Sequence, residues 1–293
     1  MNVQRAAAAV LAAALLSATP AAAQGSDPNP GSITVSGGYD VVNAYYFRGI
    51  PQEDGDFGSV MWPYLDLGFA LYSGDGVVTS LTANVGTWNS LHTGLTGLDS
   101  PVGKLWYESD VYATFGLGFG GGTAVGVTYT AYTSPNSAFT TVKEFAIKVA
   151  VDDSAYLGAA AVRPYVLLAR EFGRGESEVA LGLGQGDAGL GLGTYMEVGV
   201  APGFTVSRLG VAIPAKVGLS LADYYEGGFD PDERFGFFSL AGVVTVPFTD
   251  APGRFGTWNV HGGVEYLRLG DRNAGFAGGD NQVVGSLGIG FSY

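Results

Sequence analysis

Short segments in which apolar residues occupy every second position recur from about residue 33 to the end of the chain. The last segment is "VVGSLGIGFSY", residues 283–293. The apolar residues on one of its faces are Val283, Leu287, Ile289, Phe291 and Tyr293. A period of two is typical of a β-strand with one apolar face and one small or polar face. The chain is therefore predicted to be all-β, and its fold depends on what each face meets.

The composition predicts that the apolar faces meet lipid. Glycine accounts for 48 of 293 residues, charged residues for only 14% against about 25% in soluble domains, and the mean hydropathy is +0.22. No segment after the leader approaches eighteen consecutive apolar residues, so no transmembrane helix is expected. Strands can satisfy all their backbone hydrogen bonds in lipid only by closing into a barrel.

The first 23 residues have the features of a secretory signal. Arg5 precedes an apolar core over residues 6–16, and Ala21 and Ala23 provide the small residues of a cleavage site before Gln24. We expect a signal peptide over 1–23, a short N-terminal segment over 24–31 and an outer-membrane barrel over 32–293. The predicted location is the outer membrane of a Gram-negative bacterium.

Charge and cysteine content exclude other classes of protein. The formal net charge is −13, and removal of Arg5 with the leader makes it about −14. Nucleic acid is therefore not an expected partner. The chain has no cysteine, which excludes disulfides and thiolate chemistry.

Turn residues divide the mature chain into twelve predicted strands, an even number as in bacterial single-chain barrels. The predicted strands are 33–46, 59–72, 77–88, 104–119, 123–134, 142–151, 162–172, 192–206, 211–224, 235–247, 256–269 and 283–293. Their connections alternate between short and long, with 135–141 of only modest length. Short periplasmic turns and longer outer loops then place both termini on the periplasmic side.

Five prolines lie inside or at the edge of these strands, where a closed barrel has no free edge to excuse a missing N–H. They are Pro63, Pro164, Pro202, Pro214 and Pro247. Most lie near a strand end, where a bulge tolerates them. A two-sheet sandwich is the alternative, but too many glycines and aromatic residues would face the wrong way.

The phase opposite to the apolar one is predicted to line a narrow lumen, because twelve strands enclose less space than a sixteen-stranded porin. Besides Asp40, the predicted lumen residues that contact solute are Tyr46, Arg48, Trp62, Tyr64, Asp66, Asn84, Trp88, Trp106, Glu108, Asp110, Glu144, Lys148, Glu197, Lys216, His261 and Glu265. The three basic residues are expected to pair with carboxylates across the lumen or to lie in water.

An aromatic and acidic sector on the first four strands contains three of the four tryptophans, Trp62, Trp88 and Trp106. Such a surface binds cations or stacks on sugar rings. The alternative is that these rings fill the lumen or belong to the aromatic belt, with a one-residue bulge reversing their direction.

Signals for catalysis and metal binding are weak. His92 is expected in a loop near Ser90 and Asp99, with no motif that marks a nucleophile. His261 and Glu265 are four apart on one strand and form either a proton-sensitive pair or part of a lumen network. No catalytic residue, metal or cofactor is predicted.

Two glycine patterns and one acidic loop complete the candidate motifs. The matches to G-x-G-x-x-G at 116–121 and 184–189 do not open a helix after a buried strand, so they do not indicate phosphate binding. The acidic loop over 53–58 lacks the spacing of a calcium loop and is expected to be solvated. The alternatives are that the loop binds calcium, or that it contacts metal ions that bridge lipopolysaccharide.

The stretch "YYFRGIPQEDG", residues 45–55, resembles the signature of the TorF-like family of bacterial outer-membrane proteins, which are assigned as porins. The matching residues are Tyr45, Phe47, Arg48, Gly49, Ile50, Gln52, Asp54 and Gly55. The preceding "VVNAYY" departs from the Ser-Asp that is usual in the family. The alternating C-terminal strand with a final aromatic residue resembles the signal that the barrel-assembly machinery reads. The resemblance implies that this machinery is a partner. Outer-membrane lipid and lipopolysaccharide are the other expected partners.

Together these features predict a closed antiparallel transmembrane β-barrel that acts as a passive pore for small solutes or ions. The acidic excess favours cations. The alternatives are a closed barrel that serves as a scaffold or interaction protein, and a lipid-modifying enzyme of the outer membrane.

Overall fold

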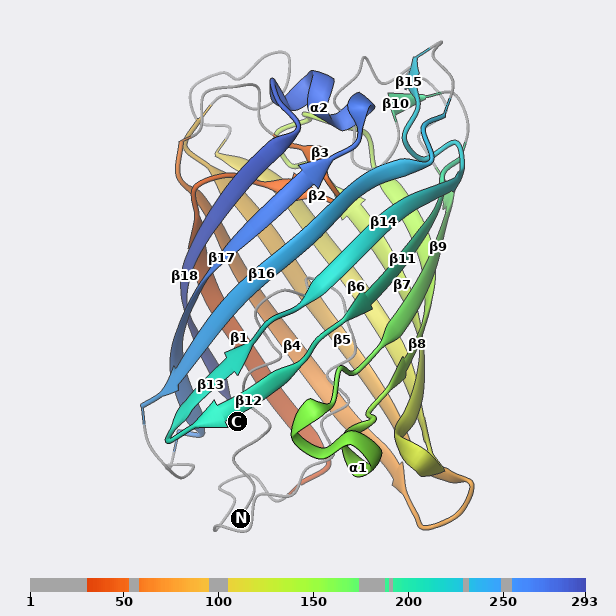
Figure 1. The fold of residues 1–293 in the computed structure, drawn as a ribbon, viewed down its shortest axis with the longest axis vertical. Coiled ribbons are helices and arrows are strands. Elements are labelled where there is room, and N and C mark those ends of the chain that lie inside the picture. Colours follow the sequence, from red (N-terminus) through yellow and green to blue (C-terminus); the bar gives the residue numbers. More distant parts are fainter. Residues whose placement is uncertain are drawn as a thin grey trace.

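The structure is a computed structural model, and it describes residues 31–52, 58–94, 105–173, 188–189, 192–228, 232–248 and 255–293. The predicted signal peptide and residues 53–57 of the acidic loop lie outside the described residues. The described chain forms one barrel of tilted antiparallel strands (Figure 1).

Twelve spanning strands make up the barrel wall, and two of them are each interrupted once. The uninterrupted strands are β1 (Ile33–Val42), β4 (Val60–Ser73), β5 (Val78–His92), β6 (Trp106–Phe119), β7 (Thr123–Thr133), β8 (Val142–Val151), β9 (Tyr165–Gly173), β16 (Phe235–Pro247), β17 (Thr257–Leu269) and β18 (Asn281–Ser292). The interrupted strands are β11 (Thr194–Val200) with β12 (Gly203–Val206), and β13 (Leu209–Ala212) with β14 (Ala215–Ala222). The predicted number and order of strands are confirmed.

The barrel closes between its first and last strands. β1 pairs with β18 in an antiparallel register from Ser36 opposite Ser292 to Val42 opposite Ser286. Val35 and Tyr293 extend this ladder by exchanging two backbone hydrogen bonds of 2.7 Å. Because β1 also pairs with β4, neither terminal strand presents a free edge.

Two of the five prolines explain the interruptions. Pro202 separates β11 from β12, and Pro214 separates β13 from β14, because proline cannot donate to the ladder. Their carbonyls still accept hydrogen bonds of 2.9 Å, from Ile213 N and Ala241 N respectively. The wall therefore remains continuous across both breaks.

The apolar phase of the strands faces outward, as predicted. In β18 the exposed fractions of Val283 and Leu287 are 60% and 63%, whereas Val284 is buried at 7%. Phe115 of β6 is similarly 60% exposed. An apolar outer surface on every side of a closed barrel is the surface that a lipid bilayer covers.

The connections differ at the two ends of the barrel. One end carries the short turns, including the 3-10 helices η1 (Gly120–Gly122) and η2 (Gly158–Ala160) and the helix α1 (Ser154–Leu157). The other end carries the longer loops and the helix α2 (Asp271–Ala277) (Figure 1). β1 begins and β18 ends at the turn end. Neither described helix is long and apolar enough to cross a membrane.

Candidate functional site

The chain leaves the barrel wall after β1 and turns into the lumen. The prediction that the first strand continues to Tyr46 is wrong, because β1 ends at Val42. At the next residue, the Asn43 side chain takes the place of the strand in bonding to β18. Its side-chain oxygen accepts from Gly285 N at 2.7 Å, and its side-chain amide donates to Val283 O at 3.4 Å. The Asn43 side chain thus bonds to two backbone groups of β18, so the residues after Asn43 do not need to pair with that strand and can leave the sheet.

The released segment is a small hairpin of β2 (Tyr46–Phe47) and β3 (Ile50–Pro51), which form a two-stranded sheet of their own. Arg48 and Gly49 form its turn with φ of 50° and 83°. Positive φ at both central residues is the geometry of a type I′ turn. A Cβ on Gly49 would lie 2.8 Å from Cβ of Phe237, so only glycine fits where the turn meets the opposite wall.

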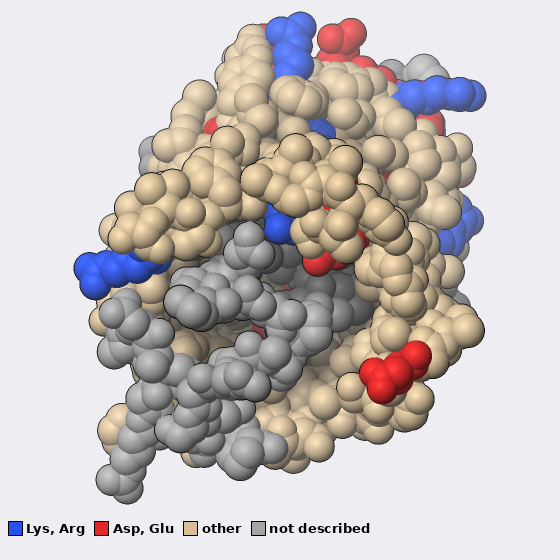
Figure 2. Space-filling view, turned by 60° about the horizontal axis from the view of Figure 1, so that its bottom comes forward, with Lys and Arg blue, Asp and Glu red and all other residues tan. Residues whose placement is uncertain are grey.

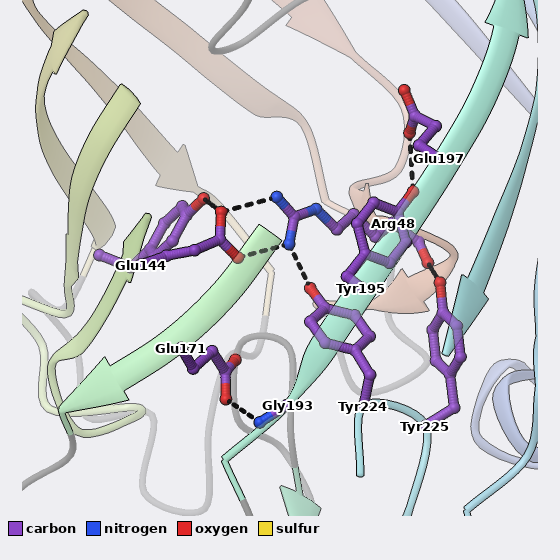
Figure 3. Close-up of polar contacts among 9 residues, drawn as sticks. Arg48, Glu144, Glu171, Gly193, Tyr195, Glu197, Tyr224 and Tyr225 are labelled. Atoms are coloured by element: carbon purple, nitrogen blue, oxygen red, sulfur yellow. Dashed lines mark hydrogen bonds and ion pairs between the residues drawn. The ribbon is translucent and has the colours of Figure 1, made fainter. Parts of the chain in front are cut away.

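The tip of the hairpin places Arg48 in a pocket of acidic and aromatic side chains (Figure 3). Its guanidinium donates to both oxygens of Glu144 at 2.6 and 2.8 Å, and to the Tyr224 hydroxyl at 2.8 Å. The guanidinium carbon lies 4.2 Å from the centre of the Tyr195 ring. Bidentate carboxylate pairing and ring stacking are the contacts that distinguish arginine from lysine.

Burial and ion pairing shift the pKa of Arg48 in opposite directions. The Arg48 side chain is 12% exposed and that of Glu144 is 3% exposed. Burial disfavours the charged guanidinium, but the adjacent Glu144 carboxylate outweighs it and raises the pKa of Arg48 well above its ordinary value. The guanidinium is therefore charged across the physiological range.

Backbone and side-chain contacts hold the rest of the hairpin. The Tyr225 hydroxyl donates to Arg48 O at 2.9 Å, and the Tyr107 hydroxyl donates to Gln52 Oε1 at 2.7 Å. Phe47 packs edge-on against Tyr132, with ring centres 5.3 Å apart. The hairpin and these rings belong to one buried cluster that fills the loop half of the lumen.

A second aromatic group lies beside the hairpin, where β5 extends further than predicted and carries His92 into the lumen. The Ser90 hydroxyl lies 2.7 Å from His92 Nε2 and accepts from the Trp62 indole at 3.1 Å. Tyr45 contacts the Trp62, Trp88 and His92 rings. Ser90 is 0% and His92 2% exposed, so both side chains are buried within the aromatic group. The pair packs against Tyr45 and Trp62 through these contacts.

The turn half of the lumen contains charged side chains that pair with tyrosine hydroxyls. Seen from the turn end, the wall surrounds an opening, and basic and acidic side chains are visible at its edge (Figure 2). Glu197 accepts from the hydroxyls of Tyr165 and Tyr195 at 2.7 Å, and Lys216 Nζ lies 3.7 Å from it. Lys148 Nζ lies 4.1 Å from the centre of the Tyr165 ring.

Acidic side chains occupy the opposite wall of this half. Asp40 Oδ1 lies 2.5 Å from His261 Nε2, and the Tyr112 hydroxyl donates to Asp66 at 2.7 Å. The proposed His261 and Glu265 pair is contradicted, because Glu265 instead accepts from Ser239. His261 belongs to a network that joins the first strand to β17.

The structure directs most of the predicted lumen residues inward. Those in the buried aromatic cluster or packed against it are Tyr46, Trp62, Tyr64 and Trp88, and Arg48 pairs with Glu144 at the tip of the hairpin. The others on the inward phase are buried or half-buried: Asp40, Asp66, Asn84, Glu108, Asp110, Lys148, Glu197, Lys216, His261 and Glu265. Solute contact at any of them stays a prediction.

Trp106 is the predicted lumen residue that faces outward. It is 48% exposed, and its indole donates to Asn89 on the outer face of β5 at 3.1 Å. A register shift between Ser90 and Leu91 places Trp106 out of phase with Glu108. The bulge therefore moves this ring from the lumen to the aromatic belt at the loop end.

Several residues of the Arg48 pocket were missed from the sequence. Tyr132 and Tyr195 lie on the inward phase of their strands, so alternation alone was sufficient to find them. Tyr224 and Tyr225 follow β14 in a loop, where no periodic signal exists. Within the described residues, no group of three or more His, Asp or Glu side chains is placed to hold a metal ion.

A cavity of about 550 Å³ lies at the loop end beside the hairpin. Tyr46 lines it together with the ends of β1 and β18 near Asn43 and Val283. The hairpin thus separates an outer cavity from the polar turn half of the lumen.

No family model and no curated protein matches the chain. Among solved structures it is similar to the NanC porin, with 12% identity and a TM-score of 0.44 over 89% of this chain and 98% of that chain. It is also similar to outer membrane phospholipase A from Escherichia coli, with 12% identity and a TM-score of 0.43 over 88% of this chain and 92% of that chain. For Salmonella typhi OmpF in complex with daunomycin, the identity is 10% and the TM-score 0.40 over 89% of this chain and 97% of that chain. Such low similarity identifies neither a family nor a function. The closed strand pairing and the apolar outer face are those of a β-barrel of the Gram-negative outer membrane.

Proposed function

We propose that the barrel is a narrow passive pore for small solutes or ions, constricted by the hairpin over Tyr46–Pro51. The observation that carries the proposal is the polar turn half of the lumen, which contains Lys148, Glu197 and Lys216 inside an apolar outer wall. A barrel that served only as a membrane anchor would have no need of charged side chains in its interior, because each must be paired or hydrated at a cost in free energy.

Cations are the proposed traffic. The inward-facing carboxylates in the described part of the chain include Asp40, Asp66, Glu108, Asp110, Glu144, Glu171, Glu197 and Glu265. Their basic counterparts there are Arg48, Lys148 and Lys216. A lumen with an excess of one sign concentrates ions of the opposite sign.

Closure by the hairpin makes passage conditional. Arg48 and its pocket fill the loop half, so the pore conducts only when the hairpin shifts from the position described here. The hairpin is a separate two-stranded sheet and not part of the barrel wall. Its movement therefore leaves the ladder of the barrel intact.

Planar-bilayer recordings of the refolded protein test this function. We expect brief, small conductance steps from the wild type, and longer openings when Tyr46–Pro51 is replaced by a glycine-serine linker. Silence of both proteins across the accessible voltage range would favour the alternative, a closed barrel that acts as a scaffold. Gel mobility of the unheated barrel provides the control for folding in both samples.

A further inference from the structure

Arg48 occupies a site that is built like a receptor for a guanidinium ion. Glu144 binds two of its nitrogens, Tyr224 accepts from one of them, and Tyr195 covers one face of the plane. Figure 3 shows these groups converging on Arg48 from several strands and from the loop after β14. A carboxylate fork beside aromatic faces is the arrangement that recognises planar cations.

The receptor belongs to the barrel, and only its occupant belongs to the hairpin. Glu144 is 96 residues from Arg48 in the sequence, and Tyr224 is 176 residues away. Glu144, Tyr195 and Tyr224 are 3%, 0% and 1% exposed. Tyr132 donates to Glu144 at 3.2 Å, and Tyr195 donates to Glu197, so other groups of the wall orient two members of the site.

We propose that this pocket is a binding site for solutes that carry a guanidinium group, and that Arg48 fills it as an internal ligand. The inference rests on the proposed pore function, because it names the solute class for which the hairpin competes. A solute that enters from the turn end meets Glu197 first and the Tyr195 ring next, since the two are hydrogen-bonded. Binding there displaces Arg48 and releases the hairpin.

The geometry favours guanidinium over other cations. Arg48 uses both terminal nitrogens for Glu144 and one of them also for Tyr224, which a single ammonium nitrogen cannot reproduce. A neutral urea has a similar planar shape but lacks the charge that Glu144 compensates. Primary amines are therefore expected to bind more weakly, and ureas more weakly still.

An Arg48→Ala variant in detergent micelles gives a direct test, because the substitution removes the fragment that ethylguanidinium replaces. Calorimetric titration with ethylguanidinium is expected to show millimolar binding to R48A. N-ethylurea, the neutral analogue, is expected to bind at least about tenfold more weakly, as is ethylguanidinium to the R48A/E144Q double variant. Wild type is the matched control, with its site already filled.

Absence of ethylguanidinium binding to folded R48A, or equal binding of N-ethylurea, would overturn the inference. If R48A alone does not fold, the yield of folded barrel on refolding with each compound becomes the readout. A higher yield with ethylguanidinium than with N-ethylurea supports the site, and equal yields refute it. The titration needs no open channel, so its result is independent of the conductance test.

Discussion

At the scale of single residues, the lumen shows how much a side chain's role depends on its phase in a strand. Trp88 and Trp106 belong to neighbouring strands, β5 and β6, yet Trp88 is 6% exposed inside the barrel and Trp106 is 48% exposed outside it. One register shift accounts for the difference. Two residues of the same type therefore serve packing of the lumen in one case and the membrane interface in the other.

This contrast provides a matched pair of variants. Trp88→Ala removes a ring that packs against Tyr45 and Trp62, so the packed half of the lumen loosens and single-channel conductance is expected to rise. Trp106→Ala alters only the outer face and is expected to leave conductance and ion selectivity unchanged. The same single-channel conductance for both variants would show that the tryptophan cluster does not limit the passage of ions.

At the scale of elements, the hairpin of β2 and β3 differs from every spanning strand because side-chain contacts, and not a ladder with the wall, hold it in place. Its turn residues have positive φ, and its arginine supplies the contacts with β8 and with the loop after β14. The strands of the wall depend instead on continuous ladders. The hairpin is therefore the element that a single substitution can displace without opening the barrel.

Gly49→Ala tests this dependence on the turn. The new methyl would lie 2.8 Å from Phe237 Cβ at a backbone φ of 83°, so we expect the hairpin to shift and the channel to spend more time open. Gly120→Ala is the control, since a Cβ there meets nothing within 4 Å. Bilayer recordings that do not distinguish G49A from wild type would exclude the hairpin as the constriction.

At the scale of the whole molecule, apolar side chains and charged side chains occupy different surfaces of the barrel. The lipid-facing wall is apolar, and the lumen concentrates carboxylates together with a few basic groups. Lys148 and Lys216 lie near Glu197 in the turn half of the lumen. These two lysines oppose the cation preference that the surrounding carboxylates create.

The double variant Lys148→Gln and Lys216→Gln is expected to increase the preference for cations, measured as the reversal potential under a salt gradient. Lys143→Gln removes one positive charge from the exposed face of β8 and is expected to leave the reversal potential near the wild-type value. The difference between them should diminish at high ionic strength, because salt screens the lumen charges. Anion preference in the wild type would contradict the proposed selectivity.

The sequence by itself determined the barrel. Alternation of apolar and small residues sets which face of each strand points outward, and lipid permits only closed pairing, so local pattern and solvent together define twelve strands and their order. The predicted bounds of 142–151 and 235–247 coincide with β8 and β16. The inward phase likewise identified Glu144 and Glu197 as lumen residues.

Only the tertiary structure decided what fills the lumen. The period of two ends at Val42, and nothing in the residues that follow states whether they point into solvent or into the barrel. Their direction follows from Arg48, whose partners Glu144 and Tyr224 come from remote parts of the chain and meet only after the barrel has closed. The bulge that turns Trp106 outward is also a property of paired strands, because register exists only between two segments.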